Sequence, residues 1–275
     1  MIARLQMARF SYPMHAIVNI ALKAARDAAE VLAHNVDRLD RIHVIDESAG
    51  GTLTNMDMDS EKTILFHLHK AYPDYSIQSR VSGFLEGKDK RHVWIIDPLC
   101  GSDNYRRGIS HFCVSIALAT EGKVQHAVVV NPMLREEFSA SRGKGAQVNT
   151  QRLRVSKMKA LEGGLVTLGN DVRDQAHSAR LVAMQQALFA LPCDVRLTAC
   201  APLDLVWAAA GRSEAGWLGE NAPESIAAAT LILQESGALI GDASGSPDIS
   251  NAAELIFGNP KCFKQLLQLR KTTLA

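Results

Sequence analysis

The stretch HVWIIDPLCGSDNYRRGISHFCVSIALATEGKVQHAVVVNP, residues 92–132, contains three apolar runs rich in valine, isoleucine and alanine. The runs are HVWIID (92–97), HFCVSIALA (111–119) and QHAVVVNP (125–132), and EEFSASRGKGAQVN (136–149) follows them with glycines at 143 and 145. Short runs of this composition, bounded by Gly, Pro, Asn and Ser, are typical of buried strands and hairpins. Their order predicts a meander in an antiparallel sheet.

The segments on either side of this meander alternate between helix and strand patterns. Residues 14–36 carry apolar side chains at helical spacing, with Ile17, Ile20, Ala21, Ala24, Ala28 and Val31 expected on one face. A polar loop containing AGG (49–51) and a second helix within SEKTILFHLHKAYP (60–73) are expected next. Later strands are expected at GLVTLG (164–169), CDVRLT (193–198), EAGWLG (214–219) and ALIGD (238–242), with helices at 174–191, 202–211 and 224–237 between them. The pattern predicts an α/β protein with an antiparallel N-terminal half.

Composition limits the classes of function. The chain has 275 residues, of which 47% are hydrophobic and 21% charged, as in an ordinary globular protein. Its formal net charge of +1 provides no global field for nucleic acid or an anionic membrane. It has no 18-residue apolar run, and its first residues lack a signal-peptide pattern. We therefore expect a cytoplasmic protein without a membrane partner, with residues 1–13 as an N-terminal extension and either Met1 or Met14 as the true start.

The five cysteines stand at positions 100, 113, 193, 200 and 262. They form no CxxC pair and no spacing with histidines that is typical of zinc. Their odd number and apolar neighbours favour reduced, mostly buried thiols.

The loop DPLCGSDN (97–104) is the first candidate for chemistry. Asp97 follows a strand, Pro98 fixes a bend, and Gly101 would let backbone amides approach a ligand. The same pattern is also an ordinary turn signal. Asp57 is either a base or metal ligand, or a helix N-cap. Arg106 and Arg107 are either phosphate contacts or solvated side chains, so local patterns alone leave each of these alternatives open.

The order of several segments resembles the inositol monophosphatase family over residues 14–270. The segments are MHAIVNIALKAARDAAEVLA, LTNMDMDSE, AYPDYSI, the long run from SGFLEGKDK to RLRVS that contains the meander, and PLDLVWAAAGRSEAGW. The resemblance implies a layered α/β/α/β/α sandwich in one unit, with sub-halves at about 14–155 and 156–275. Within the family, the chain is most similar to the bacterial extragenic suppressor proteins.

The resemblance implies hydrolysis of polyol phosphate monoesters with Mg²⁺, which carboxylates would bind. Three carboxylate ligand positions of the family fall on Arg80, Cys100 and Ser225, whereas Asp97 keeps its carboxylate and Leu99 its carbonyl as weak metal ligands. Ser102 replaces the catalytic threonine, and Asp57 keeps the carboxylate that supports it. The substrate contacts would come from Gly101, Ser102, Ala199, Cys200 and Ala201.

Charge at these positions opposes metal binding. The four ligand positions carry about four negative charges in the family but sum to roughly zero here, and Mg²⁺ gives up its hydration water reluctantly. We therefore expect weak Mg²⁺ binding or none, and we expect the Arg80 guanidinium to pair with Asp97 in the place of the metal.

Three functional hypotheses follow. The favoured one is a regulatory protein with weak or absent phosphatase activity, and the resemblance implies a homodimer and partners in transcription antitermination, NusA or RNA polymerase. The second is an active Mg²⁺-dependent inositol-1-monophosphatase with a rearranged site, in which Asp89, Asp103 or Glu220 supplies oxygen ligands. The third is metal-free binding of a small phosphorylated polyol by Arg80, Arg106 and Arg107.

Overall fold

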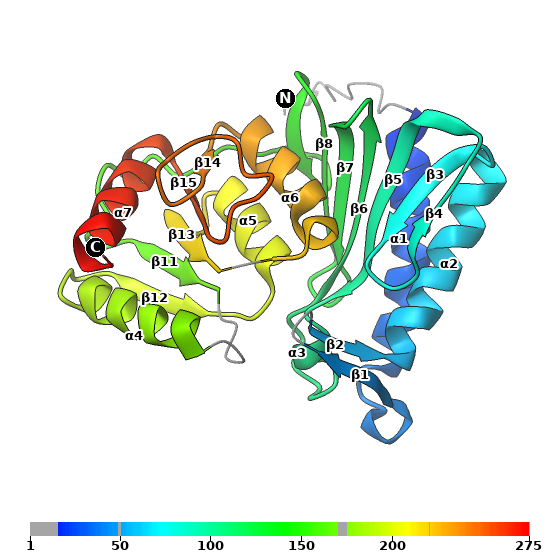
Figure 1. Ribbon diagram of the computed structural model, residues 1–275, viewed down its shortest axis with the longest axis horizontal. Helices are drawn as coiled ribbons and strands as arrows, with labels where there is room; N and C mark the ends of the chain where they lie inside the picture. Colours follow the sequence, from blue (N-terminus) through cyan, green and yellow to red (C-terminus); the bar gives the residue numbers. More distant parts are fainter. Residues whose placement is uncertain (1–15, 49–50, 170–174, 220, 275) are drawn as a thin grey trace, which may run out of the picture.

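The structure is a computed structural model that describes residues 16–48, 51–169, 175–219 and 221–274. The predicted N-terminal extension lies outside these residues. The α-helices longer than one turn are α1 (Ala16–Asn35), α2 (Asn55–Ala71), α4 (Gln175–Phe189), α5 (Ala201–Ala209), α6 (Pro223–Glu235) and α7 (Pro260–Thr273). Figure 1 shows the layers in a row: α1 with α2, an eight-stranded sheet, α5 with α6, a five-stranded sheet, and α4 with α7. The expected layered α/β/α/β/α fold is confirmed.

The eight-stranded sheet is built on the predicted meander. Its antiparallel run consists of β5 (Asp89–Cys100), β6 (Cys113–Thr120), β7 (Lys123–Asn131), β8 (Glu136–Ser141), β9 (Gly145–Val148) and β10 (Gln151–Arg152). Two further strands complete the other edge: β3 (Tyr75–Ser79) pairs parallel with β5, and β4 (Gly83–Leu85) pairs antiparallel with β3. Strand β5 therefore lies inside the sheet, which fixes the position of the loop that follows it.

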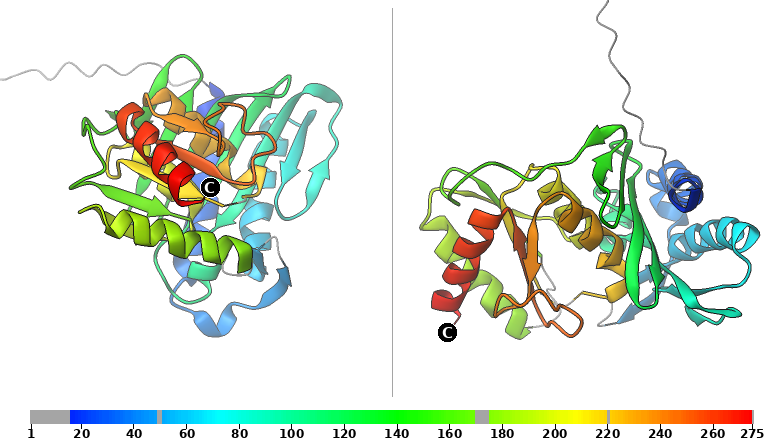
Figure 2. Two further views of the ribbon diagram at one scale, coloured as in Figure 1. Left: turned by 60° about the vertical axis from the view of Figure 1, so that its left-hand side comes forward. Right: turned by 90° about the horizontal axis from the view of Figure 1, so that it is seen from above.

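Helix α1 forms where the helical spacing of the N-terminal segment predicts a helix, but the residues at the centre of its buried face differ from those predicted. The fully buried residues are Val18, Ala21, Leu22, Ala24, Ala25, Ala28, Ala29 and Leu32. Ile17, Ile20 and Val31, which the spacing placed on the buried face, are only partly buried at its margin. The small alanines bring α1 close to α2 and to strand β7 of the sheet, and Figure 2 shows both helices on the outer face of this sheet.

The segment before α2 differs from the prediction. Instead of a polar loop, the chain forms a short 3₁₀-helix (Leu39–Arg41) and an antiparallel hairpin of β1 (Val44–Ser48) and β2 (Gly51–Thr54). Helix α2 begins at Asn55, earlier than expected, because Asp57 and Thr54 form a capping box at its start. Asp57 is therefore the third residue of the helix, and the proposed role as N-cap was wrong.

The C-terminal half contains the predicted alternation and one additional pair of elements. Its strands are β11 (Leu165–Leu168), β12 (Asp194–Leu197), β13 (Ala215–Leu218), β14 (Leu239–Gly241) and β15 (Leu255–Gly258), in the order β12-β11-β13-β15-β14. Strand β11 pairs parallel with β12 and β13, whereas β15 pairs antiparallel with β13 and β14. The sequence patterns did not identify β15 or α7.

Helices α5 and α6 join the two sheets into one core. Val129 of the eight-stranded sheet, Leu205 of α5, Ile232 of α6 and Phe257 of the five-stranded sheet belong to the same buried apolar cluster. The two helices are therefore covered on both sides, and their N-terminal ends lie near the end of β5. No helix within the described ranges is long and apolar enough to cross a membrane.

Candidate functional site

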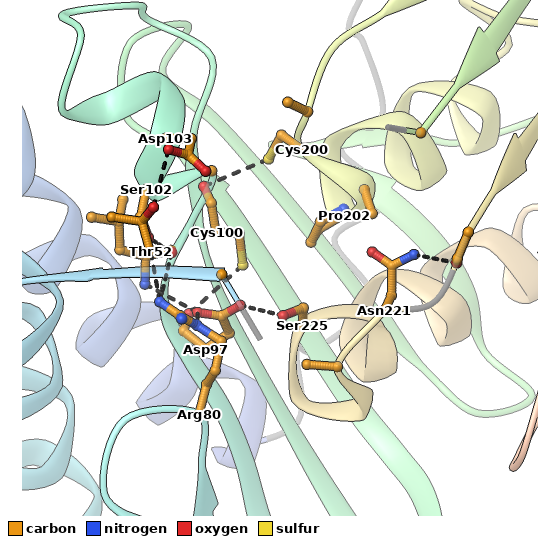
Figure 3. A pocket seen from close by; sticks show the side chains of 18 of the residues that line it. Thr52, Arg80, Asp97, Cys100, Ser102, Asp103, Cys200, Pro202, Asn221 and Ser225 are labelled. Carbon is orange, nitrogen blue, oxygen red and sulfur yellow. Dashed lines mark hydrogen bonds and ion pairs between the residues drawn. The ribbon is translucent and has the colours of Figure 1, made fainter. Parts of the chain in front are cut away.

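A cavity of about 490 Å³ lies between the end of β5 and the starts of α5 and α6. The residues that line it include ten of the sites predicted from the sequence: Arg80, Asp97, Leu99, Cys100, Gly101, Ser102, Ala199, Cys200, Ala201 and Ser225. Asp57, the eleventh, lies behind this wall and contacts both Arg80 and Ser102. Segments distant in sequence thus meet at one place, and Figure 3 shows the labelled residues that line it.

The loop after β5 turns sharply at Gly101. Its φ of 88° is in the left-handed region, and a Cβ atom there would lie 2.9 Å from the carbonyl oxygen of His111 and 3.4 Å from the sulfur of Cys200. Only glycine fits both requirements without displacing its neighbours. The turn starts the one-turn helix α3 (Ser102–Tyr105) and sets the hydroxyl of Ser102 beside Asp57.

Arg80 lies at the centre of the site, in the bond network drawn in Figure 3. Its Nε donates to Asp97 Oδ1 at 2.8 Å, and its Nη2 donates to Asp57 Oδ1. Nη2 also lies 3.3 Å from the carbonyl oxygen of Leu99 and 3.3 Å from Ser102 Oγ. The predicted pairing of Arg80 with Asp97 is present, and the same guanidinium also reaches the other oxygen atoms proposed for metal chemistry.

The two carboxylates respond differently to this cation. Burial would raise the pKa of Asp97, but the charge of Arg80 and the hydrogen bond from Ser225 outweigh burial and hold that pKa below its ordinary value. Burial also raises the pKa of Asp57, and here the charge of Arg80 and the bonds from Thr54 only partly offset it. The Coulombic attraction of Asp97 raises the pKa of Arg80 further, so the guanidinium stays charged.

Ser225 and Cys100 complete the site with neutral groups. The Ser225 hydroxyl donates to Asp97 Oδ2 at 2.5 Å, so it occupies the carboxylate oxygen that Arg80 leaves free. Burial, as the main cause, raises the pKa of the Cys100 thiol. A thiol held neutral is a poor ligand for a hard cation such as Mg²⁺.

The residues present do not fit the Mg²⁺ that the family resemblance implies. Mg²⁺ requires nearly octahedral oxygen ligands, but both oxygens of Asp97 are already hydrogen-bonded and a fixed cation lies beside them. Within the described ranges, no three His, Cys, Asp or Glu side chains are arranged to hold a metal ion. The guanidinium and the metal would compete for the same carboxylates, so binding of Mg²⁺ would require Arg80 to leave.

Two of the substitute ligands considered from the sequence, Asp89 and Asp103, are already engaged in other interactions. Asp89 lies at the far end of β5, where it accepts from His92 Nδ1 at 2.8 Å. Asp103 lines the cavity, but its Oδ1 already accepts from Thr52 Oγ1, Arg106 Nε and Arg107 Nη1 at 2.9 to 3.0 Å. Glu220 lies outside the described residues.

The arginines 106 and 107 are not among the residues that line the cavity. Both pair with Asp103, and Arg106 also bonds Glu47 of strand β1 at 3.0 Å. Arg106 thus links the β1–β2 hairpin to α3, whereas the bonds of Arg107 stay with Asp103, so the structure does not place either arginine at the cavity.

Sequence reasoning missed part of the site. Thr52, from the unpredicted hairpin, and Asn221, before α6, both line the cavity. Thr54 donates from its backbone N–H and its hydroxyl to Asp57 Oδ2, at 2.8 and 2.6 Å. Thr54 and Asp57 are three positions apart, the spacing of a capping box, which was the available signal for both the helix start and this bond.

Comparisons with known proteins agree with this fold. The inositol monophosphatase family model matches residues 14–274. The Nus factor SuhB of Pseudomonas aeruginosa is 41% identical over 258 residues, covering 92% of this chain and 95% of the relative. That of Escherichia coli strain K12 is 35% identical over 254 residues, covering 92% and 95%.

Solved structures give the same result. The extragenic suppressor protein SuhB from Bartonella henselae superimposes with a TM-score of 0.90 at 30% identity, covering 94% of this chain and 99% of that one. The IMPase of Thermotoga maritima gives a TM-score of 0.85 at 25% identity, covering 94% and 98%. The chain belongs to the inositol monophosphatase family. Among its relatives in that family are the Nus factor SuhB proteins, to which it is similar over nearly its whole length.

Proposed function

We propose that this protein is a SuhB-like regulator that works in the cytoplasm by binding partners of the transcription machinery, and that it does not use metal-dependent phosphatase chemistry. The observation that carries the proposal is the guanidinium of Arg80 bonded to both Asp57 and Asp97. It puts a permanent positive charge where the family chemistry would need a removable Mg²⁺ ion. A scaffold that binds partners through its surface does not need that ion.

The remaining groups of the cavity support this assignment. Ser102 Oγ lies 3.0 Å from Asp57 Oδ1 and 3.0 Å from the Leu99 carbonyl oxygen, so its hydroxyl has two acceptors within reach. Both oxygens of Asp57 already accept hydrogen bonds, Oδ1 from Arg80 and Oδ2 from Thr54, so neither is left open to take a proton from water. We infer that Asp57, Ser102 and the other predicted site residues now stabilise the loop after β5.

An activity assay tests the loss of chemistry. The purified chain is incubated with inositol 1-phosphate over a range of Mg²⁺ concentrations, with the Thermotoga maritima IMPase as the positive control. We expect no phosphate release above the rate of a heat-denatured sample. Turnover comparable to the control enzyme, dependent on Mg²⁺, would refute the proposal.

A binding assay tests the role with partners. The tagged chain is mixed with purified NusA or with RNA polymerase, with and without EDTA, and the bound fraction is measured after capture. We expect retention that is insensitive to EDTA, because Arg80 substitutes for the ion. No enrichment over a tagged control protein for either partner would contradict the proposed role. Light scattering on the same samples tests the expected homodimer.

A further inference from the structure

Three thiols lie close together beside the cavity, and the segments that carry them are separated in the sequence. Cys100 ends β5, Cys113 begins β6 directly opposite it, and Cys200 is the N-cap residue of α5. The sulfur atoms of Cys113 and Cys200 lie 3.9 Å apart, and Cys200 Sγ is 3.6 Å from the Cys100 carbonyl oxygen. All three side chains are buried and all are free thiols.

The surroundings of the three thiols favour oxidation chemistry and not metal binding. Within the described part of the chain, no group of three such side chains is placed to hold a metal ion. Cys200 lines the cavity, which is large enough for water-sized molecules, whereas Cys113 is not part of its lining. Of the two thiols at 113 and 200, Cys200 is therefore the one that a peroxide in the cavity meets first. Cys113 lies behind it, where it can act as the resolving thiol.

We propose that Cys113 and Cys200 form a reversible disulfide when the protein meets a peroxide. The Cys200 thiolate attacks one oxygen of hydrogen peroxide, which yields a sulfenic acid and, after proton transfer, one water molecule. The Cys113 thiol then attacks the Cys200 sulfur, the S–O bond breaks, and the hydroxyl leaves with the thiol proton as a second water molecule. Two thiols are oxidised and one peroxide is reduced, and a dithiol reductant reverses the reaction.

The bond would join the eight-stranded sheet to the start of helix α5. Cys113 belongs to the eight-stranded sheet, and Cys200 begins the helix that packs against both sheets, 87 positions later. A link across such a long loop restricts the unfolded chain strongly. Because Cys200 lines the cavity beside Gly101, the link would also fix the cavity wall. This inference is independent of the proposed transcription role.

The test uses the folded full-length chain with hydrogen peroxide, followed by alkylation, digestion without reductant and mass spectrometry. We expect a cross-linked peptide pair containing Cys113 and Cys200, which disappears after treatment with dithiothreitol. The oxidised chain should unfold at a temperature higher by roughly 5 °C. The variants Cys113→Ala and Cys200→Ala, checked for native circular dichroism, should lose both the cross-link and the shift.

A matched control variant is Cys262→Ala, since Cys262 is also fully buried but its sulfur contacts backbone carbonyls and Asn259. It should form the cross-link as the wild type does. Three results would overturn the proposal: a cross-link that involves Cys100, a Cys200 that proceeds to sulfinic acid without cross-linking, or thiols that remain unmodified until the chain unfolds. If either cysteine variant fails to fold, the wild-type peptide map still decides between these outcomes.

Discussion

Replacement of Arg80 by methionine tests whether the guanidinium stabilises the site in place of a metal. The Arg80 side chain is 14% exposed, and the carboxylates that it bonds are 0% (Asp57) and 2% (Asp97) exposed. Methionine keeps most of the side-chain volume but leaves two buried carboxylates without a cation. Removing one member of a buried ion pair costs about 3 to 5 kcal/mol of stability, so we expect Arg80→Met to lower the free energy of unfolding by about 3 kcal/mol at pH 7.

The loss should depend on pH with a definite sign. In the wild type the pKa of Asp97 is held below its ordinary value of 3.8. The ion pair therefore stabilises the folded state fully above pH 3.8, and this stabilisation is lost as the pH falls through the lowered pKa. In Arg80→Met both carboxylates would have raised pKa values and take up protons earlier during acidification. The difference in stability between the two proteins should therefore be largest near neutral pH and shrink toward acid pH.

Urea denaturation monitored by circular dichroism at several pH values measures this difference by linear extrapolation. Arg26→Met is the matched control, because Arg26 also forms a bidentate bond, to Glu137, but is 46% exposed. An exposed pair contributes under about 1 kcal/mol, so this variant should be nearly neutral. If Arg80→Met costs no more than the control, or if its cost does not change with pH, the assignment of Arg80 as the stabilising cation is wrong.

Three further predictions concern the same region. The combined variant Arg80→Glu, Cys100→Asp and Ser225→Asp should bind Mg²⁺ in isothermal calorimetry, whereas each single change should not, because the ligands act as a set. The wild type should lose stability as the pH rises from about 4 to 8, and Asp204→Asn should not show this loss. Burial raises the pKa of Asp204 to about 8, so over this range the folded chain keeps a proton that the unfolded chain releases. Thermal melts at several pH values in this range measure the difference. Gly101→Ala should lower the free energy of unfolding by about 2 kcal/mol in urea titrations, because its φ is 88° and the new methyl group would lie 2.9 Å from a backbone oxygen.

The meander was predictable because its information is local. Strands β5, β6 and β7 each contain a run of apolar or β-branched residues, turn residues separate the strands of residues 92–149, and consecutive strands pair. Strands β1 (VIDES) and β2 (GTLT) contain no apolar run longer than two residues, so the sequence around them predicts a polar loop. Helix α7 does have a local signal in the sequence, an Asn259 N-cap followed by proline at the first helical position.

The site was partly predictable by resemblance and not by pattern. The family motifs assigned Arg80, Asp97 and Ser225 to one place, and the structure brings them into hydrogen-bond contact. The bond from Arg80 to Asp57 and the contact between Cys113 and Cys200 were not predicted. The first depends on how α2 packs against the eight-stranded sheet, and the second on how α5 packs against it. No local sequence signal encodes either distance.

The replacements at the site depend on one another through charge. With Arg80 present, the buried centre contains one fixed cation, and its guanidinium forms an ion pair with both Asp57 and Asp97. A further aspartate at position 100 or 225 would add a buried negative charge that no nearby cation balances. The neutral thiol of Cys100 and the hydroxyl of Ser225 avoid that cost, and the hydroxyl also satisfies the second oxygen of Asp97. Arginine at position 80 therefore makes neutral residues at the other two positions the stable choice, and the loop after β5 keeps its shape without a metal ion.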